Sequence, residues 1–416
     1  MKKAGVINAA GLTGLLVFSN ALYGFETTKV PPKGVRTIMF RNVTTSVDQK
    51  TDSGGKHLPL AEPLTKALTF RRILNGEKNP FKRNSMAAFL TREAEAGNIN
   101  IDDNVGTFTG EVKANIDVFA PVMAWGLTDT LALAVGAPVY HITTNVTMGF
   151  QPNNATAEQF LGTLAYDMRQ AGSTRDTILK LNDARGEADR TLEEYGYRPL
   201  GPWEETGIGD TIIALKQLIY SEDNLAIAWQ GGLVAPTGAI DDPDIQGDLA
   251  MGDGQWDAFL QFAFDEPLGG GLVLNQYAKY TYQAPGKKPI RLATELESVR
   301  VAKEDVAFKL GDKMDAGLSV MYEPPSGLQL GLGGTWFKKY GDTYFDVPTD
   351  VNMWLTRESE QEATYGEARI GYSTLPAYLR GEVMAPFGIN LDYRKQLASR
   401  NQPITDFFEL DFNIFF

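Results

Sequence analysis

Apolar and polar side chains alternate along the last residues of the chain. The positions between the apolar ones are mostly acidic or amide side chains. Successive side chains of a β-strand point to opposite faces, so this period of two predicts a strand with one apolar and one polar face. Such a strand suits the wall of a membrane barrel, with its apolar face toward lipid. An amphipathic strand of a soluble sandwich is the alternative interpretation. The apolar positions are Phe408, Leu410, Phe412, Ile414 and Phe416.

The same alternation recurs in many segments upstream. Residues 225–235 place Leu225, Ile227 and Trp229 on one face and small or amide side chains on the other. An apolar outer face over a small or polar inner face is the reverse of a water-soluble barrel. We therefore predict an all-β fold, a transmembrane antiparallel β-barrel. It has about twelve predicted strands, at 35–44, 108–124, 128–142, 207–221, 224–236, 254–266, 270–284, 313–323, 327–340, 361–374, 376–391 and 404–416.

Short and long connections alternate between these strands, as in barrels with short periplasmic turns and long extracellular loops. The largest predicted extracellular insertions are 45–107 and 143–206. The segment 285–312 is long enough to hold a further hairpin, so fourteen strands is the alternative count. Both large insertions contain apolar residues at helical spacing, which predicts helices at 84–96, 157–168 and 174–194.

The N-terminus has the three parts of a secretory signal. Met1-Lys2-Lys3 is a basic start, residues 4–18 are mostly apolar or small, and Ala21 ends a small-x-small cleavage motif. We predict a signal peptide over residues 1–21, cleaved between residues 21 and 24, and a single outer-membrane barrel domain over 22–416. A membrane anchor is the alternative interpretation. No other stretch approaches the ~20 apolar residues of a membrane helix, so strands have to make any crossing.

Composition excludes several functional classes. The chain has 416 residues and no cysteine, so disulfides and thiolate chemistry cannot contribute. Its net charge of −13 argues against nucleic acid as a partner, because such binding depends on clustered lysine and arginine. The two histidines, His57 and His141, fall in or beside predicted outer loops without a nucleophile motif nearby. We predict that the chain is not an enzyme and has no catalytic residues.

Charged and aromatic side chains fall on the predicted inner faces of the strands. If the strands pair through their short turns, Arg369 faces Glu382, and Asp257 faces Lys279. A plugged polar core and a substrate path are equally consistent with these charges. The residues predicted to line the lumen are Lys113, Asp117, Phe119, Asp210, Lys216, Asp257, Phe259, Tyr277, Lys279, Arg369, Arg380 and Glu382.

One acidic loop, 241–253, has the spacing of a calcium loop. Counting from its second residue, carboxylates fall at positions 1, 3, 7 and 12, with glycine at position 6. Position 5 is glutamine, position 12 is aspartate rather than glutamate, and strands rather than helices flank the loop. An acidic solvated loop is therefore the alternative to a Ca²⁺ site, and no other cofactor is predicted. The candidate ligands are Asp242, Asp244, Asp248 and Asp253.

Four short segments carry a family resemblance. They are Lys33-Gly34-Val35-Arg36, Gly207-Ile208-Gly209-Asp210, Leu233-Val234-Ala235-Pro236-Thr237-Gly238 and Gly252-Asp253-Gly254-Gln255-Trp256-Asp257. These segments resemble the meta-pathway phenol-degradation transporter-like family of bacterial outer-membrane proteins, and more distantly the fatty-acid-transporter-like barrels. The resemblance is best across about 200–285. It implies passive uptake of small molecules, often aromatic or apolar ones.

We predict a passive channel or transporter of the bacterial outer membrane for small hydrophobic or aromatic molecules. Its predicted partners are outer-membrane lipid, the solute and the barrel-assembly machinery, with no nucleic acid. The strand that ends in Phe416 resembles the C-terminal signal that this machinery reads. A plugged structural or surface-interaction barrel is one alternative, and a general porin for polar solutes is another.

Overall fold

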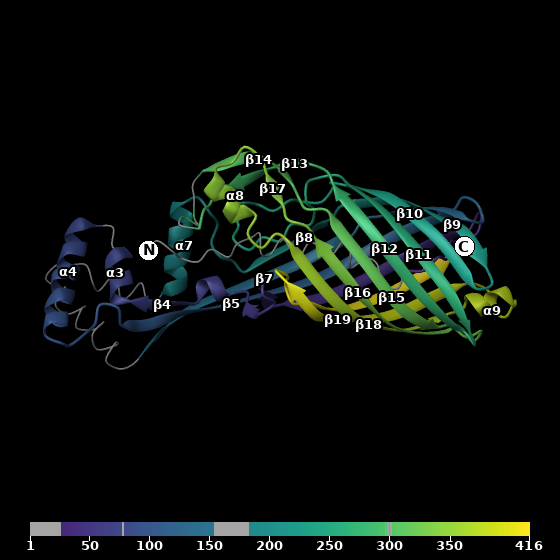
Figure 1. The fold of residues 1–416 in the computed structure, drawn as a ribbon, viewed down its shortest axis with the longest axis horizontal. Helices are drawn as coiled ribbons and strands as arrows, with labels where there is room; N and C mark the ends of the chain where they lie inside the picture. Colours follow the sequence, from purple (N-terminus) through teal and green to yellow (C-terminus); the bar gives the residue numbers. More distant parts are fainter. Residues whose placement is uncertain (1–25, 77–78, 154–182, 296, 298, 300–301) are drawn as a thin grey trace.

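The computed structural model describes residues 26–416 except 77–78, 154–182, 296, 298 and 300–301. The predicted signal peptide and the helix predicted at 157–168 therefore lie outside the described residues. Among the described helices, none is both long enough and apolar enough to span a membrane. The labels of helices and strands below are those of Figure 1.

The chain forms a closed antiparallel barrel of twelve wall strands (Figure 1). The ring closes because β1 (Arg36–Val47) pairs with β5 (Asn104–Gly126) on one side and with β20 (Asp406–Phe415) on the other. A closed ring leaves no strand edge without a hydrogen-bonding partner. The other wall strands are β6 (Leu131–Gly136), β7 (Val139–Pro152), β8 (Trp203–Ile208), β9 (Thr211–Glu222), β10 (Leu225–Ala235), β11 (Asp257–Gly269), β12 (Leu272–Gln283), β15 (Lys313–Tyr322), β16 (Leu328–Lys339), β18 (Gln361–Ser373) and β19 (Phe387–Arg400).

Two wall strands are each built from two pieces. β7 follows β6 after Ala137 and Pro138, and β9 follows β8 after Gly209 and Asp210. Proline has no N–H to donate to the strand ladder, so the ladder is interrupted here. One hydrogen bond bridges the gap, in which the Gly209 N–H donates to Pro138 O at 2.7 Å. Counted as wall strands, these pieces confirm the prediction of twelve.

The alternative of fourteen strands is wrong. The segment 285–312 does contain a hairpin, of β13 (Gly286–Arg291) and β14 (Lys303–Lys309). It pairs with β17 (Thr343–Tyr344) in a separate three-stranded sheet and does not enter the barrel wall. The helix α8 (Thr349–Leu355) packs on this sheet, and the shared apolar core comprises Ile290, Val306, Val351 and Leu355.

Strand β19 lies further along the chain than the sequence predicts. The prediction is 376–391, whereas the observed strand begins at Phe387 and is preceded by the short helix α9 (Leu375–Leu379). Two prolines and a glycine at positive φ interrupt the alternation before Phe387. Arg380 and Glu382 lie in this exposed turn and pair with each other at 2.7 Å. Their predicted place in the lumen is therefore wrong.

The outer face of the membrane-spanning wall is apolar. Leu332 on β16 is 70% exposed, and large apolar side chains from the neighbouring strands are exposed beside it. An exposed apolar belt of this extent is what contact with lipid requires. The predicted polarity of the last strand is confirmed, because Glu409 and Asp411 are buried inside. The exposed belt includes Leu215, Leu233, Leu260, Phe262, Leu318, Leu332, Ile370, Leu391, Phe408, Leu410 and Phe412.

β5 and β7 continue beyond the barrel as a two-stranded ribbon with a helical unit at its end, at the left of Figure 1. At the far end, β4 (Lys66–Thr69) pairs with β5, and α3 (Phe70–Gly76) and α4 (Pro80–Glu95) pack there around buried Met86 and Leu90. The helix predicted at 84–96 is confirmed by α4. The same insertion contains β2 (Gln49–Thr51), β3 (His57–Pro59) and the 3-10 helix η2 (Glu62–Leu64).

The inner face of the wall becomes apolar at its extracellular end. Inward side chains of β1, β5 and β7 pack there with α7 (Ala184–Glu194), which confirms the second half of the helix predicted at 174–194. The side chains in this core include Val43, Val47, Val112, Ile116, Val118, Tyr140, Ile142, Leu192, Leu249 and Met251.

This apolar interior reverses the polarity of β5. Lys113 and Asp117 are exposed on the outer face, and Phe119 is 41% exposed. Their predicted inward orientation is wrong, because this part of the strand has an apolar core inside. The alternation along β5 is real, but its apolar side faces inward here.

Candidate functional site

The lumen of the spanning barrel is polar, and the start of the described chain runs through it. Residues 26–28 lie inside the wall, where Glu26 and Thr28 are buried. Asp265 Oδ2 accepts hydrogen bonds from Thr28 N–H at 2.8 Å and from Thr28 Oγ1 at 2.6 Å. Lys216 Nζ donates to Thr27 O at 2.6 Å, so this predicted lumen residue does point inward. The segment therefore occupies part of the lumen and is held there by hydrogen bonds to the wall.

Three arginines and four carboxylates face the lumen from β18, β19, β20 and β1. Arg41 donates two hydrogen bonds to Asp411, from Nε to Oδ1 and from Nη2 to Oδ2, both at 2.7 Å. Arg41 Nε also lies 3.1 Å from Glu409 Oε1. Since β1 and β20 are the first and last wall strands, these contacts cross the seam that closes the barrel. We call this set the seam network; its members are Arg41, Glu367, Arg369, Asp392, Arg394, Glu409 and Asp411.

The rest of the seam network links β18 to β20. Arg369 donates to both oxygens of Asp392 at 2.6 Å, and these residues are register partners. Arg394 Nη2 donates to Glu409 Oε2 at 2.7 Å. The predicted pairing of Arg369 with Glu382 is therefore wrong, although Arg369 does face the lumen.

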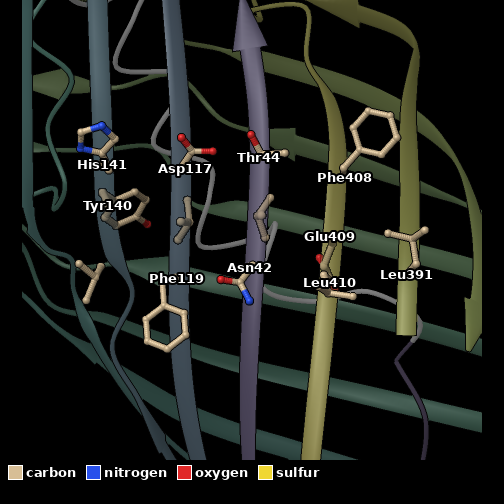
Figure 2. Close-up of a pocket in the computed structure, with 13 residues that line it drawn as sticks. Asn42, Thr44, Asp117, Phe119, Tyr140, His141, Leu391, Phe408, Glu409 and Leu410 are labelled. Atoms are coloured by element: carbon tan, nitrogen blue, oxygen red, sulfur yellow. The ribbon is translucent and has the colours of Figure 1, made fainter. Parts of the chain in front are cut away.

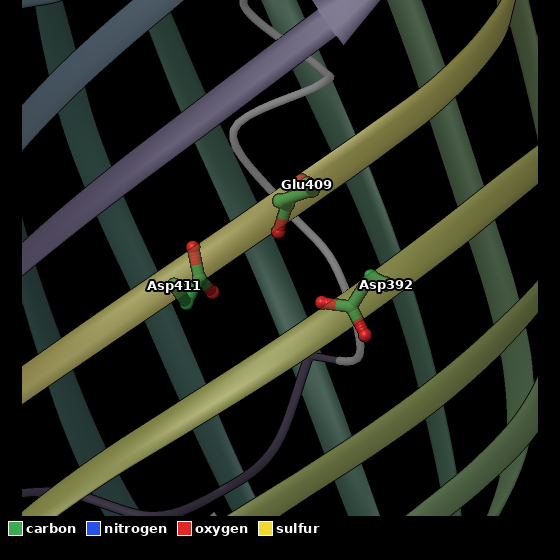
Figure 3. A group of neighbouring side chains, drawn as sticks. All are labelled: Asp392, Glu409 and Asp411. Atoms are coloured by element: carbon green, nitrogen blue, oxygen red, sulfur yellow. The ribbon is translucent and has the colours of Figure 1, made fainter.

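Three carboxylates of the seam network form the one group among the described residues with the spacing of a metal site. Asp392, Glu409 and Asp411 bring oxygen atoms within 4.8 Å of one another (Figure 3). However, both oxygens of Asp392 and both oxygens of Asp411 already accept from arginine. The donor set therefore fits an ion-pair network and does not fit a cation.

A second set of charges lines the opposite side of the lumen, on β11, β12 and β15. Asp257 and Lys279 are both buried and inward, but the register pairs Asp257 with Gln283. The predicted pair of Asp257 with Lys279 is therefore wrong. Lys313 Nζ lies 3.8 Å from Asp257, and Lys279 Nζ lies 4.8 Å from the centre of the Phe259 ring. The latter is a cation–π contact.

Aromatic rings stand beside these charges, as the sequence predicts. Phe259 is buried against Ala214 and Val234. The ring of Tyr277 lies over Gly317, where an added Cβ would come within 2.2 Å of it, so a larger residue here would force the ring to move. Aromatic rings and ionic groups thus lie side by side in the lumen.

Asp210 fastens an extracellular loop to the break between β8 and β9. Its Oδ1 accepts from the Gly238 N–H at 2.9 Å, and its Oδ2 accepts from the Asp253 N–H at 3.2 Å. The loop 237–253 is thereby held against the wall at the break. Asp210 therefore holds the loop through backbone N–H groups.

The four aspartates predicted as calcium ligands do not come together. Asp244 accepts from Arg291 at 2.6 Å and from Lys303 at 2.8 Å. Asp248 Oδ2 accepts from the Asp242 N–H at 2.6 Å, and burial raises the pKa of Asp248 to about 6. Within the part of the chain that the structure describes, these aspartates form no group with metal spacing. Ion pairs and hydrogen bonds order this loop.

A hollow of about 320 Å³ opens in the outer wall near its extracellular edge (Figure 2). It was missed from the sequence, where 35–44 reads only as a first strand. The signal that could have revealed it is the pair of short polar side chains at 42 and 44, next to the apolar belt. We call this hollow the outer groove; its outward-facing lining is Asn42, Thr44, Asp117, Phe119, His141, Leu391, Phe408 and Leu410.

Comparison with known proteins gives one family and several similar structures. The family model described as "Putative MetA-pathway of phenol degradation" matches residues 95–352. No curated protein matches the sequence significantly. An outer membrane channel from Pseudomonas putida F1 is 12% identical with a TM-score of 0.51, over 94% of this chain and 98% of that one. This likeness shows a shared fold.

Two further structures are similar at lower TM-scores. The toluene transporter TbuX of Ralstonia pickettii is 8% identical with a TM-score of 0.35, over 92% of this chain and 90% of that one. A FadL homologue of Pseudomonas aeruginosa gives the same identity, TM-score and coverage.

Proposed function

We propose that this chain, which belongs to the family of the MetA-pathway of phenol degradation, is a passive outer-membrane channel for small hydrophobic or aromatic molecules. The closed barrel and its apolar outer belt place it in the bacterial outer membrane. The family match covers more than half of the chain, and the fold is shared with an outer membrane channel.

The observation that carries the proposal is the division of the interior into two parts. The extracellular part is apolar and is built from side chains such as Val118, Tyr140 and Ile142. The membrane-spanning part carries charges and aromatic rings and contains residues 26–28, which are held by a few hydrogen bonds. An apolar interior above a passage that carries aromatic rings suits a hydrophobic solute. Displacement of residues 26–28 by a passing solute breaks these hydrogen bonds and the one that Gln261 Nε2 donates to Glu26 Oε2 at 2.9 Å.

We assign the protein no enzymatic activity. His141 Nδ1 lies 2.8 Å from Thr206 Oγ1 on the outer wall, and Glu204 is 3.9 Å from its other ring nitrogen. In this geometry the hydrogen-bond partner of the histidine is a threonine of strand β8. As part of the same proposal, the strand that ends in Phe416 is the signal for barrel assembly, and lipid surrounds the belt.

The test measures uptake in porin-deficient cells that carry the full chain or an empty vector. A labelled small aromatic acid and a sugar of similar size are compared, and single-channel conductance is recorded for the purified barrel in a planar bilayer. We expect faster uptake of the aromatic acid only. Equal acceleration of both solutes indicates a general porin. No uptake and no conductance, even after deletion of residues 26–31, indicates the structural barrel.

A further inference from the structure

The outer groove follows β1 because the side chains there are short. Asn42 and Thr44 form its floor, and larger side chains rise on either side from the neighbouring strands (Figure 2). Register pairing sets Asn42 between Phe119 on β5 and Leu410 on β20. At the end nearer the periplasm, Phe40 stacks on Phe119 with ring centres 5.9 Å apart. The groove is therefore closed below by aromatic rings.

The polarity of the groove changes along its length. The lower row contains Phe119, Asn42 and Leu410, and the row above contains His141, Asp117, Thr44 and Phe408, as Figure 2 shows. Phe408 is 53% exposed and Leu410 is 43% exposed, so one wall belongs to the lipid-facing belt. The upper end of the groove carries the Asp117 carboxylate, the Thr44 hydroxyl and the His141 imidazole. The groove thus spans the boundary between the apolar belt and the polar extracellular surface.

The polar floor makes few contacts within the protein. Across the described ranges, the side chains of Asn42, Thr44 and Asp117 make no hydrogen bond or ion pair. A polar group on the lipid face of a barrel carries a cost that depends on its depth, and Asn42 lies in a row with apolar neighbours on both sides. A ligand that donates a hydrogen bond to this floor offsets that cost.

We propose that the outer groove binds a one- or two-ring aromatic molecule that carries a hydrogen-bond donor, of the phenol or aniline type. A cavity of about 150 Å³ accommodates benzene, so a volume of about 320 Å³ suits one or two rings. Phe119 and Phe408 supply ring faces for the aromatic body. Asn42 Oδ1 and the Asp117 carboxylate supply acceptors for the donor.

A membrane lipid fits the groove less well. Several acyl chains exceed its volume, and the carboxylates of Asp117 and Glu204 at its upper end repel an anionic phosphate. The proposed site lies on the outside of the wall and does not depend on passage through the lumen. It requires only that the barrel spans the membrane.

The test compares 4-bromophenol with bromobenzene, which differ by one hydroxyl group. Full-length protein in nanodiscs of zwitterionic lipid is titrated with each compound by calorimetry, with empty nanodiscs subtracted for partition. We expect 4-bromophenol to bind at least about tenfold more tightly, because only it can donate to the polar floor. Equal affinity for the two compounds contradicts the proposal.

Variants locate the binding to the outer groove. Asn42→Leu fills the floor with an apolar side chain that suits lipid, and it should weaken 4-bromophenol binding about tenfold. Phe119→Ala removes one side of the groove and should weaken the binding of both compounds. Leu332→Ala, on an exposed belt position of β16, is the matched control and should change neither. Unchanged 4-bromophenol affinity in Asn42→Leu, with the barrel still heat-modifiable, overturns the assignment. Uptake in cells tests the proposed channel separately, so either proposal can fail alone.

Discussion

Substitution of Arg41 by methionine is expected to destabilise the barrel strongly. Arg41 has 6% of its side chain exposed, and its partners Asp411 and Glu409 have 3% and 1% exposed. Removal of one partner from a buried ion pair costs about 3–5 kcal/mol, because the remaining charge stays buried without compensation. Here the loss leaves two arginines facing four carboxylates in the seam network. We therefore expect Arg41→Met to lower the free energy of unfolding by about 3–5 kcal/mol.

Removal of a carboxylate from the seam network should lower the free energy of unfolding by less. Asp411→Asn leaves three arginines and three carboxylates, and Arg41 keeps Glu409 at 3.1 Å. We expect a loss of about 1–3 kcal/mol, as for a buried hydrogen-bonding group that loses a charged partner. In the double variant the two losses should not add, because the second substitution removes a carboxylate that the first has already left without its arginine.

The measurement is urea unfolding in lipid vesicles, followed by tryptophan fluorescence. Arg380→Met is the matched control, because Arg380 makes a 2.7 Å ion pair with Glu382 in an exposed turn. Exposed pairs contribute little, so this variant should keep the wild-type midpoint. If Arg41→Met shifts the midpoint no more than Arg380→Met, the seam network is hydrated and the reasoning is refuted. Additive losses in the double variant refute the coupling.

Three further outcomes are expected. Arg369→Glu should lose stability and regain part of it with Asp392→Arg, whereas adding Glu382→Arg should restore nothing; a double-mutant cycle in urea measures both couplings. Phe416→Asp should leave export intact and block assembly, so the heat-modifiable form should vanish from outer-membrane fractions. Asp248 has a folded pKa of about 6, above its ordinary value near 3.8, so its stabilising contribution is full below about pH 4 and is lost as the pH rises through 6. Asp248→Asn should therefore flatten the pH dependence of loop protection, by at most about 3 kcal/mol, in hydrogen exchange of residues 237–253.

Strand pairing registers could not be predicted, because the turns are not where composition places them. A turn centred on residue 268 pairs Asp257 with Lys279, but the observed turn contains three glycines at positive φ, Gly269 to Gly271. Glycine adopts this conformation without steric cost, so the strands extend to it and pass Pro267 on the way. Every cross-strand partner on these two strands shifts with the turn. The prediction of which side chains point inward on these strands remains correct, because the displacement keeps each side chain on its own face.

The orientation of β5 could not be predicted either, for a different reason. A period of two separates the faces of a strand, and it does not say which face meets lipid, water or a core. Along β12 and β16 the apolar face is outside, whereas along the extracellular part of β5 it is inside with Val112 and Ile116. The difference arises because α7 and the loops, which lie far along the sequence, supply the apolar side chains that pack against the inner face of β5. The orientation of the closing strand could be predicted, because Glu409 and Asp411 identify its polar face and this face lines the lumen.

The first strand joins the two features that the sequence did not reveal. Arg41 points inward to the seam network, and Asn42, the next residue, points outward to the floor of the outer groove. Adjacent residues of one strand thus serve opposite faces of the wall, so a change at one need not disturb the other. Asn42→Leu should weaken 4-bromophenol binding and keep the unfolding midpoint, because an apolar side chain suits the lipid face. Arg41→Met should lower the midpoint and, wherever the barrel remains folded, keep the tenfold preference for 4-bromophenol. A variant of either residue that changes both properties equally would mean that the seam and the groove form one unit.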